Sequence, residues 1–373
     1  MIKTILKTST PCHCVLRYGI SKILVASTLV FISVNAFADT VKCGDKEVGS
    51  YITVGNDTYL VVGDGFGKNG IYNDDIRTGI IKGTQKVCTS HVTNMQYLFD
   101  GSCIKTINLS IQAIKKTKNW LKVIKNSTTP PNNLKKPKVD YINEMKEERK
   151  YISDNVCALV THSNFKQNIN NWDVSAVTNM KGMFSGAFSF NQSLSDWDVS
   201  NVTDMSTMFS SAMNFNRPLN SWNVSHVTNM FNMFRLASNF NQPLDKWNVS
   251  SVDNISGMFS GAITFNQPLD MWDVSKVNNM SGIFSSASDF NQPLNDWDVS
   301  NVKNMQAMFS YARRFDQPLD NWDVSKVKSM KFMFLNASSF NQPLDNWNVS
   351  SVTDSSDFAE NSKLSQENLP KFK

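Results

Sequence analysis

The stretch that decides the fold is residues 240–264, FNQPLDKWNVSSVDNISGMFSGAIT, followed at residues 265–289 by FNQPLDMWDVSKVNNMSGIFSSASD. The two segments align without a gap at a period of 25 residues, and the pattern continues on both sides. Eight tryptophans keep the same step: Trp172, Trp197, Trp222, Trp247, Trp272, Trp297, Trp322 and Trp347. Because self-similarity at such a period is typical of stacked repeats, the sequence predicts a linear array.

Two columns of phenylalanine keep this step as well. The first is Phe165, Phe190, Phe215, Phe240, Phe265, Phe290, Phe315 and Phe340, and the second is Phe184, Phe209, Phe234, Phe259, Phe284, Phe309 and Phe334. One unit alone has an apolar face with nothing to cover it, whereas units stacked roughly 5 Å apart cover one another. We therefore expect a solenoid whose tryptophan, phenylalanine, methionine and valine columns form a continuous interior.

Each unit is expected to contain one short helix and one short strand, which makes the fold class α/β. Val177, Met180 and Phe184 stand at i, i+3 and i+7, as on one face of a helix that ends near residue 187. Residues 190–194, usually FNQPL in later units, suit a brief strand, which the usual proline keeps imperfect. Asn179, Asn191 and their equivalents could form side-chain ladders between coils.

Regular columns of aspartate and methionine are explained by the repeat without a metal or cofactor. The aspartates Asp173, Asp198, Asp273, Asp298 and Asp323 resemble a calcium array, but Asn223, Asn248 and Asn348 occupy the same slot. A turn residue that accepts hydrogen bonds explains both. Ile255 stands in the methionine column, which indicates apolar core rather than soft-metal binding.

Residues 1–38 are predicted to be a secretory signal peptide. An apolar run of about a dozen residues follows a basic region that contains Lys3, Lys7, Arg17 and Lys22. Residues 36–38, AFA, suit cleavage before Asp39. A membrane anchor is the alternative, but a spanning helix needs roughly 20 apolar residues. Cleavage would lower the net charge from +5 to +1, so the mature chain is nearly neutral and no nucleic-acid partner is expected. No later segment is apolar enough to predict a transmembrane helix.

The mature chain divides into five segments by its repeat pattern. They are an N-terminal cap at 39–87 with a β-hairpin near residues 51–62, a first partial repeat at 88–102, a basic helical insertion at 103–163, the solenoid at 164–354, and a C-terminal cap and polar tail at 355–373. Residues 65–70 spell G-x-G-x-x-G, but no helix pattern follows them. We interpret them as a glycine-rich loop and expect no cofactor.

The insertion at 103–163 holds twelve basic and five acidic residues. It predicts a basic helix at 110–126 and a charged helix at 140–152. The helix at 110–126 carries candidate partner-binding residues Lys115, Lys116, Lys118, Trp120, Lys122 and Lys125. A pad for anionic glycans, lipid headgroups or a protein is the functional interpretation. A solvated helical hairpin packed on the array is the alternative.

Four cysteines remain after signal cleavage: Cys43, Cys88, Cys103 and Cys157. An even count in an exported chain suggests two disulfides among three possible connectivities. The pairs Cys43–Cys88 and Cys103–Cys157 are favoured because each brackets a compositionally distinct segment. Four free thiols are the alternative.

The unit F-N-Q-P-L-D-x-W-D/N-V-S-x-V-x-N-M-x-x-M-F-x-x-A resembles the BspA-like family of bacterial surface proteins, whose degenerate leucine-rich repeats also occur in mycoplasma surface lipoproteins. The resemblance covers residues 164–354 and, less specifically, 88–102. It implies a leucine-rich-repeat-like α/β solenoid and a surface or secreted role in adhesion. The chain lacks a lipobox, which puts lipid anchoring in doubt.

Three functions remain open from the sequence. The first is a binding or adhesion module for a protein or glycan partner outside the cytoplasm, at the cell surface, secreted or periplasmic, with oligomeric state undetermined. Its candidate contacts include His226, Lys276 and Lys326, from a column of slots that vary between units. The second is a structural envelope or assembly protein without an external ligand. The third, a glycan-active enzyme, lacks a unique carboxylate pair, so no catalytic residue is expected.

Overall fold

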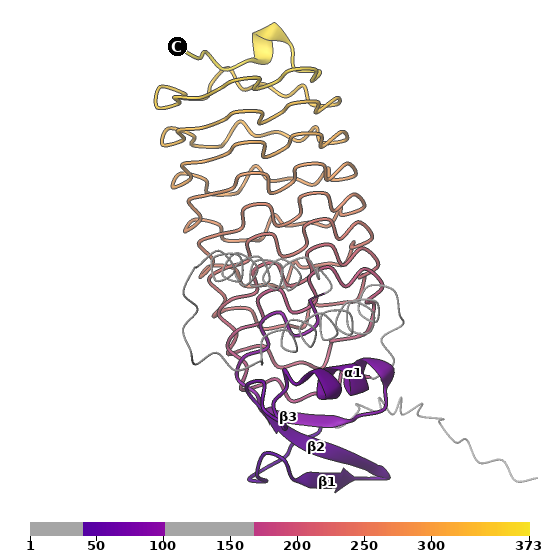
Figure 1. The fold of residues 1–373 in the computed structure, drawn as a ribbon. Helices are drawn as coiled ribbons and strands as arrows, with labels where there is room; N and C mark the ends of the chain where they lie inside the picture. Colours follow the sequence, from indigo (N-terminus) through magenta and orange to yellow (C-terminus); the bar gives the residue numbers. More distant parts are fainter. Residues whose placement is uncertain (1–39, 101–167) are drawn as a thin grey trace, which may run out of the picture. The chain divides into compact units, whose positions relative to one another are not determined.

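The computed structural model describes residues 40–100 and 168–373 (Figure 1). The chain divides into two compact units, Met1–Phe37 and Ala38–Lys373, and every described residue belongs to the second. The predicted signal peptide at 1–38 and the predicted insertion at 103–163, with its two helices, lie outside the described residues.

The N-terminal elements form a three-stranded sheet with one helix. The strands β1 (Tyr51–Val54), β2 (Asp57–Gly63) and β3 (Val87–His91) lie in the order β1-β2-β3, and α1 spans Asp74–Lys82. β1 and β2 pair antiparallel around a turn at Gly55, so the predicted hairpin is confirmed. β2 and β3 pair in parallel, with α1 as the connection between them.

This β2-α1-β3 unit corrects the expectation that no helix follows the G-x-G-x-x-G loop. The helix has nine residues, too few for a clear periodic pattern in the sequence. The interpretation as a structural loop is supported by its packing. Gly65 has a φ of 98°, and a Cβ on Gly70 would collide with the Gly65 carbonyl. Asn73 caps the backbone of α1, and Asp74 and Asp75 make its first turn acidic, which disfavours a bound phosphate.

From residue 168 onward the chain forms coils stacked one above another (Figure 1). Isolated parallel bridges join equivalent residues of neighbouring coils. They link in turn Asn94, Asn179, Asp204, Asn229, Asn254, Asn279, Asn304, Ser329 and Asp354. Asn94 and Asn179 pair although 85 residues separate them, so residues 92–100 form the first coil, as the spacing predicted.

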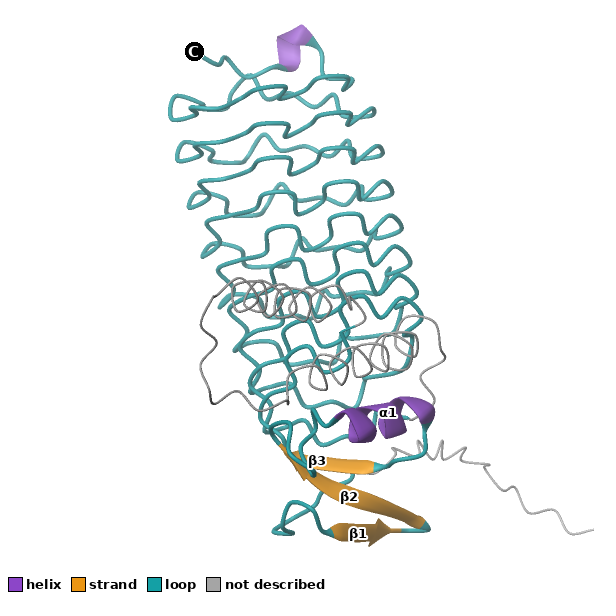
Figure 2. Cartoon of the chain, in the orientation of Figure 1, coloured by secondary structure: helices purple, strands orange, loops and turns teal. Residues whose placement is uncertain are grey.

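Within these coils, residues 168–365 contain no helix or strand (Figure 2). Consecutive β-turns occupy residues 180–187, which we call the turn ribbon together with its equivalents in other coils. Met183 N–H donates to the Met180 carbonyl at 3.2 Å, and Ala187 N–H donates to the Phe184 carbonyl at 3.1 Å. The predicted helix at 177–187 is therefore wrong.

The N–H groups that these turns leave free bond to the next coil. The donor and acceptor pairs are Met180 to Asp204 at 2.9 Å, Gly182 to Ser206 at 2.8 Å, Phe184 to Met208 at 2.9 Å and Gly186 to Ser210 at 2.7 Å. An α-helix would instead use its N–H groups internally. Apolar residues spaced three and four apart face one side in a helix and also in this ribbon, which is why the spacing misled.

Two residues in each turn ribbon from residue 180 onward, and Tyr97 in the described part of the first ribbon, have a left-handed backbone. The first column, with φ between 51° and 64°, is Tyr97, Gly182, Thr207, Asn232, Gly257, Gly282, Ala307, Phe332 and Asp357. The second, with φ between 56° and 72°, is Gly186, Ser211, Leu236, Gly261, Ser286, Tyr311, Asn336 and Asn361. Both columns stand third in a β-turn, where a left-handed residue marks a type II turn and favours glycine or asparagine.

The predicted strand at 190–194 is also absent, and a side-chain ladder takes its place. Asn216 N–H donates to Asn191 Oδ1 at 3.0 Å, and Asn241 N–H donates in the same way to Asn216 Oδ1 at 3.0 Å. Gln242 Nε2 adds a second bond to Asn216 Oδ1 at 2.9 Å. The proline usual in this stretch has no N–H for a strand ladder. The asparagine side-chain oxygens instead accept the backbone N–H groups of the asparagines in the next coil. This asparagine ladder was predicted. The Asn179 column differs, because its side chain bonds the N–H two residues on, within its own coil.

Aromatic stacks fill the interior. Phe184 and Phe209 stack with centroids 5.6 Å apart, and Trp197 and Trp222 stack at 6.3 Å. From Trp197 to Trp347, each tryptophan also donates its indole N–H to a carbonyl of the preceding coil, as Trp197 Nε1 does to the carbonyl of Ile169 at 2.8 Å. Apolar burial and a satisfied polar atom therefore come from the same side chain.

Residues 355–373, predicted as a C-terminal cap and polar tail, pack on the last coil as far as Phe372. Phe358 meets Phe334 edge to face at 5.4 Å, and Phe372 meets Phe358 at 5.0 Å. Asn368, in the short 3-10 helix η2 (Gln366–Asn368), accepts the N–H of Leu344 at 2.9 Å. The few apolar residues of this segment form no periodic pattern in the sequence, yet they cover the end of the apolar core.

The ribbon geometry predicts different costs for two equivalent alanine substitutions. Gly257→Ala and Gly282→Ala both place a Cβ at a φ above 60°, which costs about 1 kcal/mol. At Gly257 the new Cβ would also collide with the Asn232 side chain, whereas at Gly282 the nearest atom is 3.8 Å away. We expect Gly257→Ala to lower the urea midpoint of unfolding clearly more than Gly282→Ala. Equal losses would contradict the stacking of side chains described here.

Candidate binding surface

Two solvent-facing columns flank a buried valine column and form what we call the presenting face. The valine column, which includes Val177, is at most 1% exposed from Val177 to Val327. The first flanking column is Ala176, Asn201, His226, Ser251, Lys276, Asn301, Lys326 and Ser351, and the second is Thr178, Thr203, Thr228, Asp253, Asn278, Lys303, Lys328 and Thr353. All residues of the second column are exposed, and those of the first are exposed or half-buried. The inward valine therefore sets which residues face outward.

Several side chains of the first column bond back to the preceding coil. Asn201 Nδ2 donates to the Ser175 carbonyl at 2.8 Å, and Asn301 Nδ2 makes the equivalent bond at 2.9 Å. The His226 ring reaches the Ser200 carbonyl through Nδ1 at 2.8 Å, which requires the proton on that nitrogen. His226, a candidate contact from the sequence, is exposed but also helps to hold its coil.

Lysines gather on the presenting face between residues 276 and 328. Lys276 and Lys326, both candidates from the sequence, are exposed, and Lys326 Nζ donates to Asn301 Oδ1 at 2.9 Å. Lys303 and Lys328 join them from the second column, which the sequence interpretation overlooked although the 25-residue spacing reveals it. The described salt bridges involve none of these four lysines. Their charges are therefore available to an approaching anionic group.

The aspartate column beside the first presenting column forms local turns. Asp273 Oδ1 accepts from Ser275 Oγ at 2.6 Å and from Ser275 N–H at 3.1 Å, and these bonds, aided by nearby Lys276, lower its pKa. Asn223 accepts from Ser225 N–H in the same way at 3.2 Å. The predicted role as a hydrogen-bonding turn residue is confirmed. The described residues contain no cluster of three or more ligands that could hold a metal.

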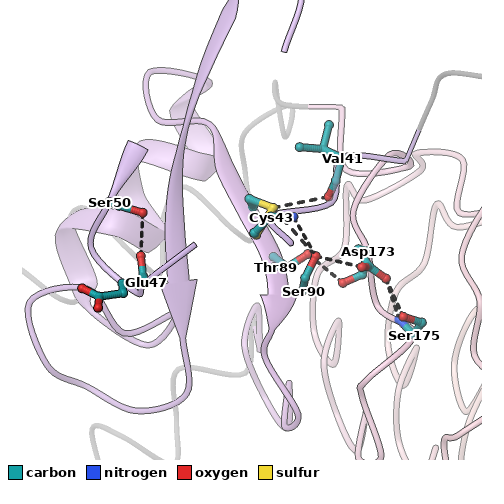
Figure 3. The surroundings of a disulfide bond; sticks show 9 residues. Val41, Cys43, Glu47, Ser50, Thr89, Ser90, Asp173 and Ser175 are labelled. Atoms are coloured by element: carbon teal, nitrogen blue, oxygen red, sulfur yellow. Dashed lines mark hydrogen bonds between the residues drawn. A yellow bond between two sulfur atoms is a disulfide. The ribbon is translucent and has the colours of Figure 1, made fainter. Parts of the chain in front are cut away.

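The joint between the N-terminal sheet and the coils is built around a disulfide (Figure 3). Cys43 and Cys88 are bonded, which is the pairing that the sequence favoured. Beside them, Thr89 Oγ1 donates to the Asp173 carbonyl at 2.9 Å, and Ser90 Oγ donates to Asp173 Oδ2 at 2.8 Å. The disulfide thus links two N-terminal residues 45 positions apart, and the hydrogen bonds beside it link Thr89 and Ser90 to a residue of the coils more than 80 positions further along the chain. Cys103 and Cys157 lie outside the described residues.

Asp173 is the buried carboxylate of this joint. Burial works against its charge, but hydrogen bonds from Ser175 and Ser90, helped by Lys42, prevail and lower its pKa. Its other oxygen accepts from Ser175 Oγ at 2.6 Å. The ionised form is therefore the one that holds the sheet to the coils.

The predicted partner-binding residues of the insertion, Lys115, Lys116, Lys118, Trp120, Lys122 and Lys125, lie outside the described residues and stay a prediction. Among the described helices, none is long and apolar enough to cross a membrane.

One protein-family model, described as "Mycoplasma protein of unknown function, DUF285", matches residues 154–271 and 262–372. The two matches together cover more than half of the chain. The chain belongs to this family. The DUF285 region includes the coils from Trp172 onward and the segment that closes the last coil. No curated protein and no solved structure matches the chain.

The Asp173 joint predicts a pH-dependent contribution to stability. Because its pKa is lower in the folded chain than the usual value of about 3.9, its contribution is present above that value and is lost as the pH falls through the folded pKa. Asp173→Asn should therefore cost about 1 kcal/mol at neutral pH, and this gap should shrink below about pH 4 in unfolding measurements.

Asp198→Asn is the matched control, since Asp198 stands in the same column, is exposed and accepts only from Ser200 N–H at 3.1 Å. It should change stability little at any pH. A gap for Asp173→Asn that stays constant down to pH 2 would contradict the role of its charge.

Proposed function

We propose that this DUF285 protein is an exported repeat protein that binds a macromolecule outside the cytoplasm and catalyses no reaction. One observation carries the proposal. The presenting face changes from threonine and asparagine to lysine along equivalent backbone positions, while the valine column between its two rows stays uniform. Varied exposed chemistry on a fixed frame suits recognition of an extended partner.

The proposed class is a leucine-rich-repeat-like solenoid related to the BspA-like surface proteins. The parallel bridges at 25-residue steps support a solenoid. The DUF285 match supports a relation to mycoplasma-type repeat proteins. Adhesion to a host or matrix protein or glycan is the role that this relation favours.

Export is part of the proposal. The Cys43–Cys88 bond supports it, because disulfides persist mainly in oxidising compartments. The cell surface and the medium are the favoured destinations, with the periplasm as the alternative.

A structural role in the envelope is the second candidate. β1 is an edge strand with Tyr51 64% and Val54 42% exposed, and such an edge can pair with another chain. Side chains of the presenting face also bond to the preceding coil, which fits a structural role in holding the coils together without an external ligand.

Binding can be tested with the secreted full chain against a panel of matrix proteins, mucins and host cells. We expect binding at micromolar concentration that weakens when lysines of the presenting face are lost. The variant Lys303→Thr/Lys328→Thr adopts the threonine found at Thr203 and Thr228, so its fold should be kept. Affinity should fall about fivefold, more at low salt than at high salt.

The control is Lys181→Ser/Lys246→Asn, which removes the same charge elsewhere and adopts residues found at equivalent positions. Absence of binding to the whole panel, together with concentration-dependent self-association, would favour the structural role instead.

Export predicts a mature protein that begins at Asp39. N-terminal sequencing of the protein from intact cells should find this terminus, and protease added to intact cells should degrade the chain. A protected, processed chain would place it in the periplasm and rule out direct host contact.

A further inference from the structure

A shallow notch of about 300 Å³, open to solvent, interrupts the outer side of the turn ribbons. Gly257 and Gly282 form its floor. Phe231 and Asn232 line it from the preceding coil, and Gln306 and Ala307 line it from the following coil.

The notch arises from how the first left-handed column stacks. Its side chains lean onto the next coil, as Asn232 lies where a Cβ of Gly257 would be and Tyr97 lies where a Cβ of Gly182 would be. Gly257 and Gly282 have no side chain to lean forward, so the places over Gly282 and Ala307 stay open. Thr207, Asn232 and Phe332 have the same backbone conformation in other coils. The fold therefore does not require glycine at this position in two neighbouring coils.

The wall of the notch carries an exposed aromatic ring. Phe231 is 40% exposed and occupies a column that holds serine at Ser206, Ser256 and Ser281. Its hydrogen bonds are made by the backbone, from its N–H to Asn229 Oδ1 and from Thr207 N–H to its carbonyl. The ring is therefore not needed for the local fold, and its exposed face is available for contact.

Two uncharged carboxamides of the notch are free, whereas the Ser256 hydroxyl donates to Asn254 Oδ1 at 2.7 Å. The carboxamides of Asn232 and Gln306 make no side-chain hydrogen bond within the part of the chain that the structure describes, and each offers both donors and an acceptor. Among the residues that the structure describes, no charged one lines the notch. A charged ligand would therefore find no counter-charge among the lining residues.

We propose that the notch binds an uncharged sugar residue of a glycan. A sugar ring has an apolar C–H face, which packs on the Phe231 ring, and hydroxyl groups, which pair with carboxamides as donor and acceptor at once. This inference rests on the proposed binding function and names the ligand class at a site distinct from the lysines of the presenting face.

The test uses the full chain and two probes, an array of neutral and acidic glycans and calorimetric titration with chitotriose and maltotriose. We expect at least one uncharged oligosaccharide to bind below about 1 mM. Phe231→Ser, which adopts the residue of neighbouring coils, should weaken that binding at least about tenfold. Gly282→Asn should do the same, because asparagine tolerates the left-handed backbone and its side chain would fill the opening over Ala307.

Thr207→Asn is the matched control, since it makes a similar change in the same column outside the notch. It should leave the affinity unchanged, and thermal unfolding should show that all three variants keep their fold. A Gly282→Asn variant that binds like the original chain would overturn the assignment of the site. Absence of any binding by uncharged glycans, or notch-dependent binding of acidic glycans or peptides instead, would overturn the ligand class.

This outcome is separable from that of the binding panel. If matrix proteins or cells bind but no uncharged oligosaccharide binds in a way that depends on the notch, the notch inference fails while the proposed function stands. If neither the panel nor the glycans bind, both fail.

Discussion

The hydrogen bonds from one turn ribbon to the next are the constraint on which the structure depends. Alternate N–H groups from Met180 to Gly186 bond to the following coil, so neighbouring ribbons must stay in register. A shift by one residue would break these bonds and misalign the aromatic stacks, which accounts for the fixed 25-residue period. The long interruption after residue 100 is tolerated because it follows the paired part of the first ribbon, where Phe99 N–H still donates to the Met183 carbonyl at 2.8 Å.

A stack held by such bonds must close its ends. At the first coil, the Asp64 carboxylate accepts the N–H groups of Thr93 at 3.1 Å and Asn94 at 3.2 Å. Tyr72 donates its hydroxyl to the carbonyls of Asn94 and Gln96, and burial together with the charge of Asp64 raises its pKa to about 12. The phenol therefore remains a donor at physiological pH. The N-terminal segment thus closes the stack of coils by bonding the polar groups that its first coil leaves open.

The sequence predicts what the repeat itself encodes and misses what depends on the path of the backbone. The period, the buried columns, the asparagine ladder of Asn191 and the Cys43–Cys88 bond are all readable from spacing. The turn ribbon was mistaken for a helix because both place Met180 and Phe184 on one side. The candidate lysines Lys276 and Lys326 were predicted as exposed, but the notch could not be, since it depends on side chains leaning onto the next coil.

The ribbon also explains how one frame can carry different surfaces. Its conformation is held by bonds to neighbouring coils, so a left-handed position accepts glycine, asparagine and even Phe332 at a φ of 59°. Glycine at such a position lowers the surface, and a large residue raises it, without a change in the path of the chain. Gly257 and Gly282, at equivalent positions of neighbouring coils, therefore leave a hollow in the surface at one place. Surface relief in this protein is set by side-chain volume along a single column, while stability is set by the interior behind it.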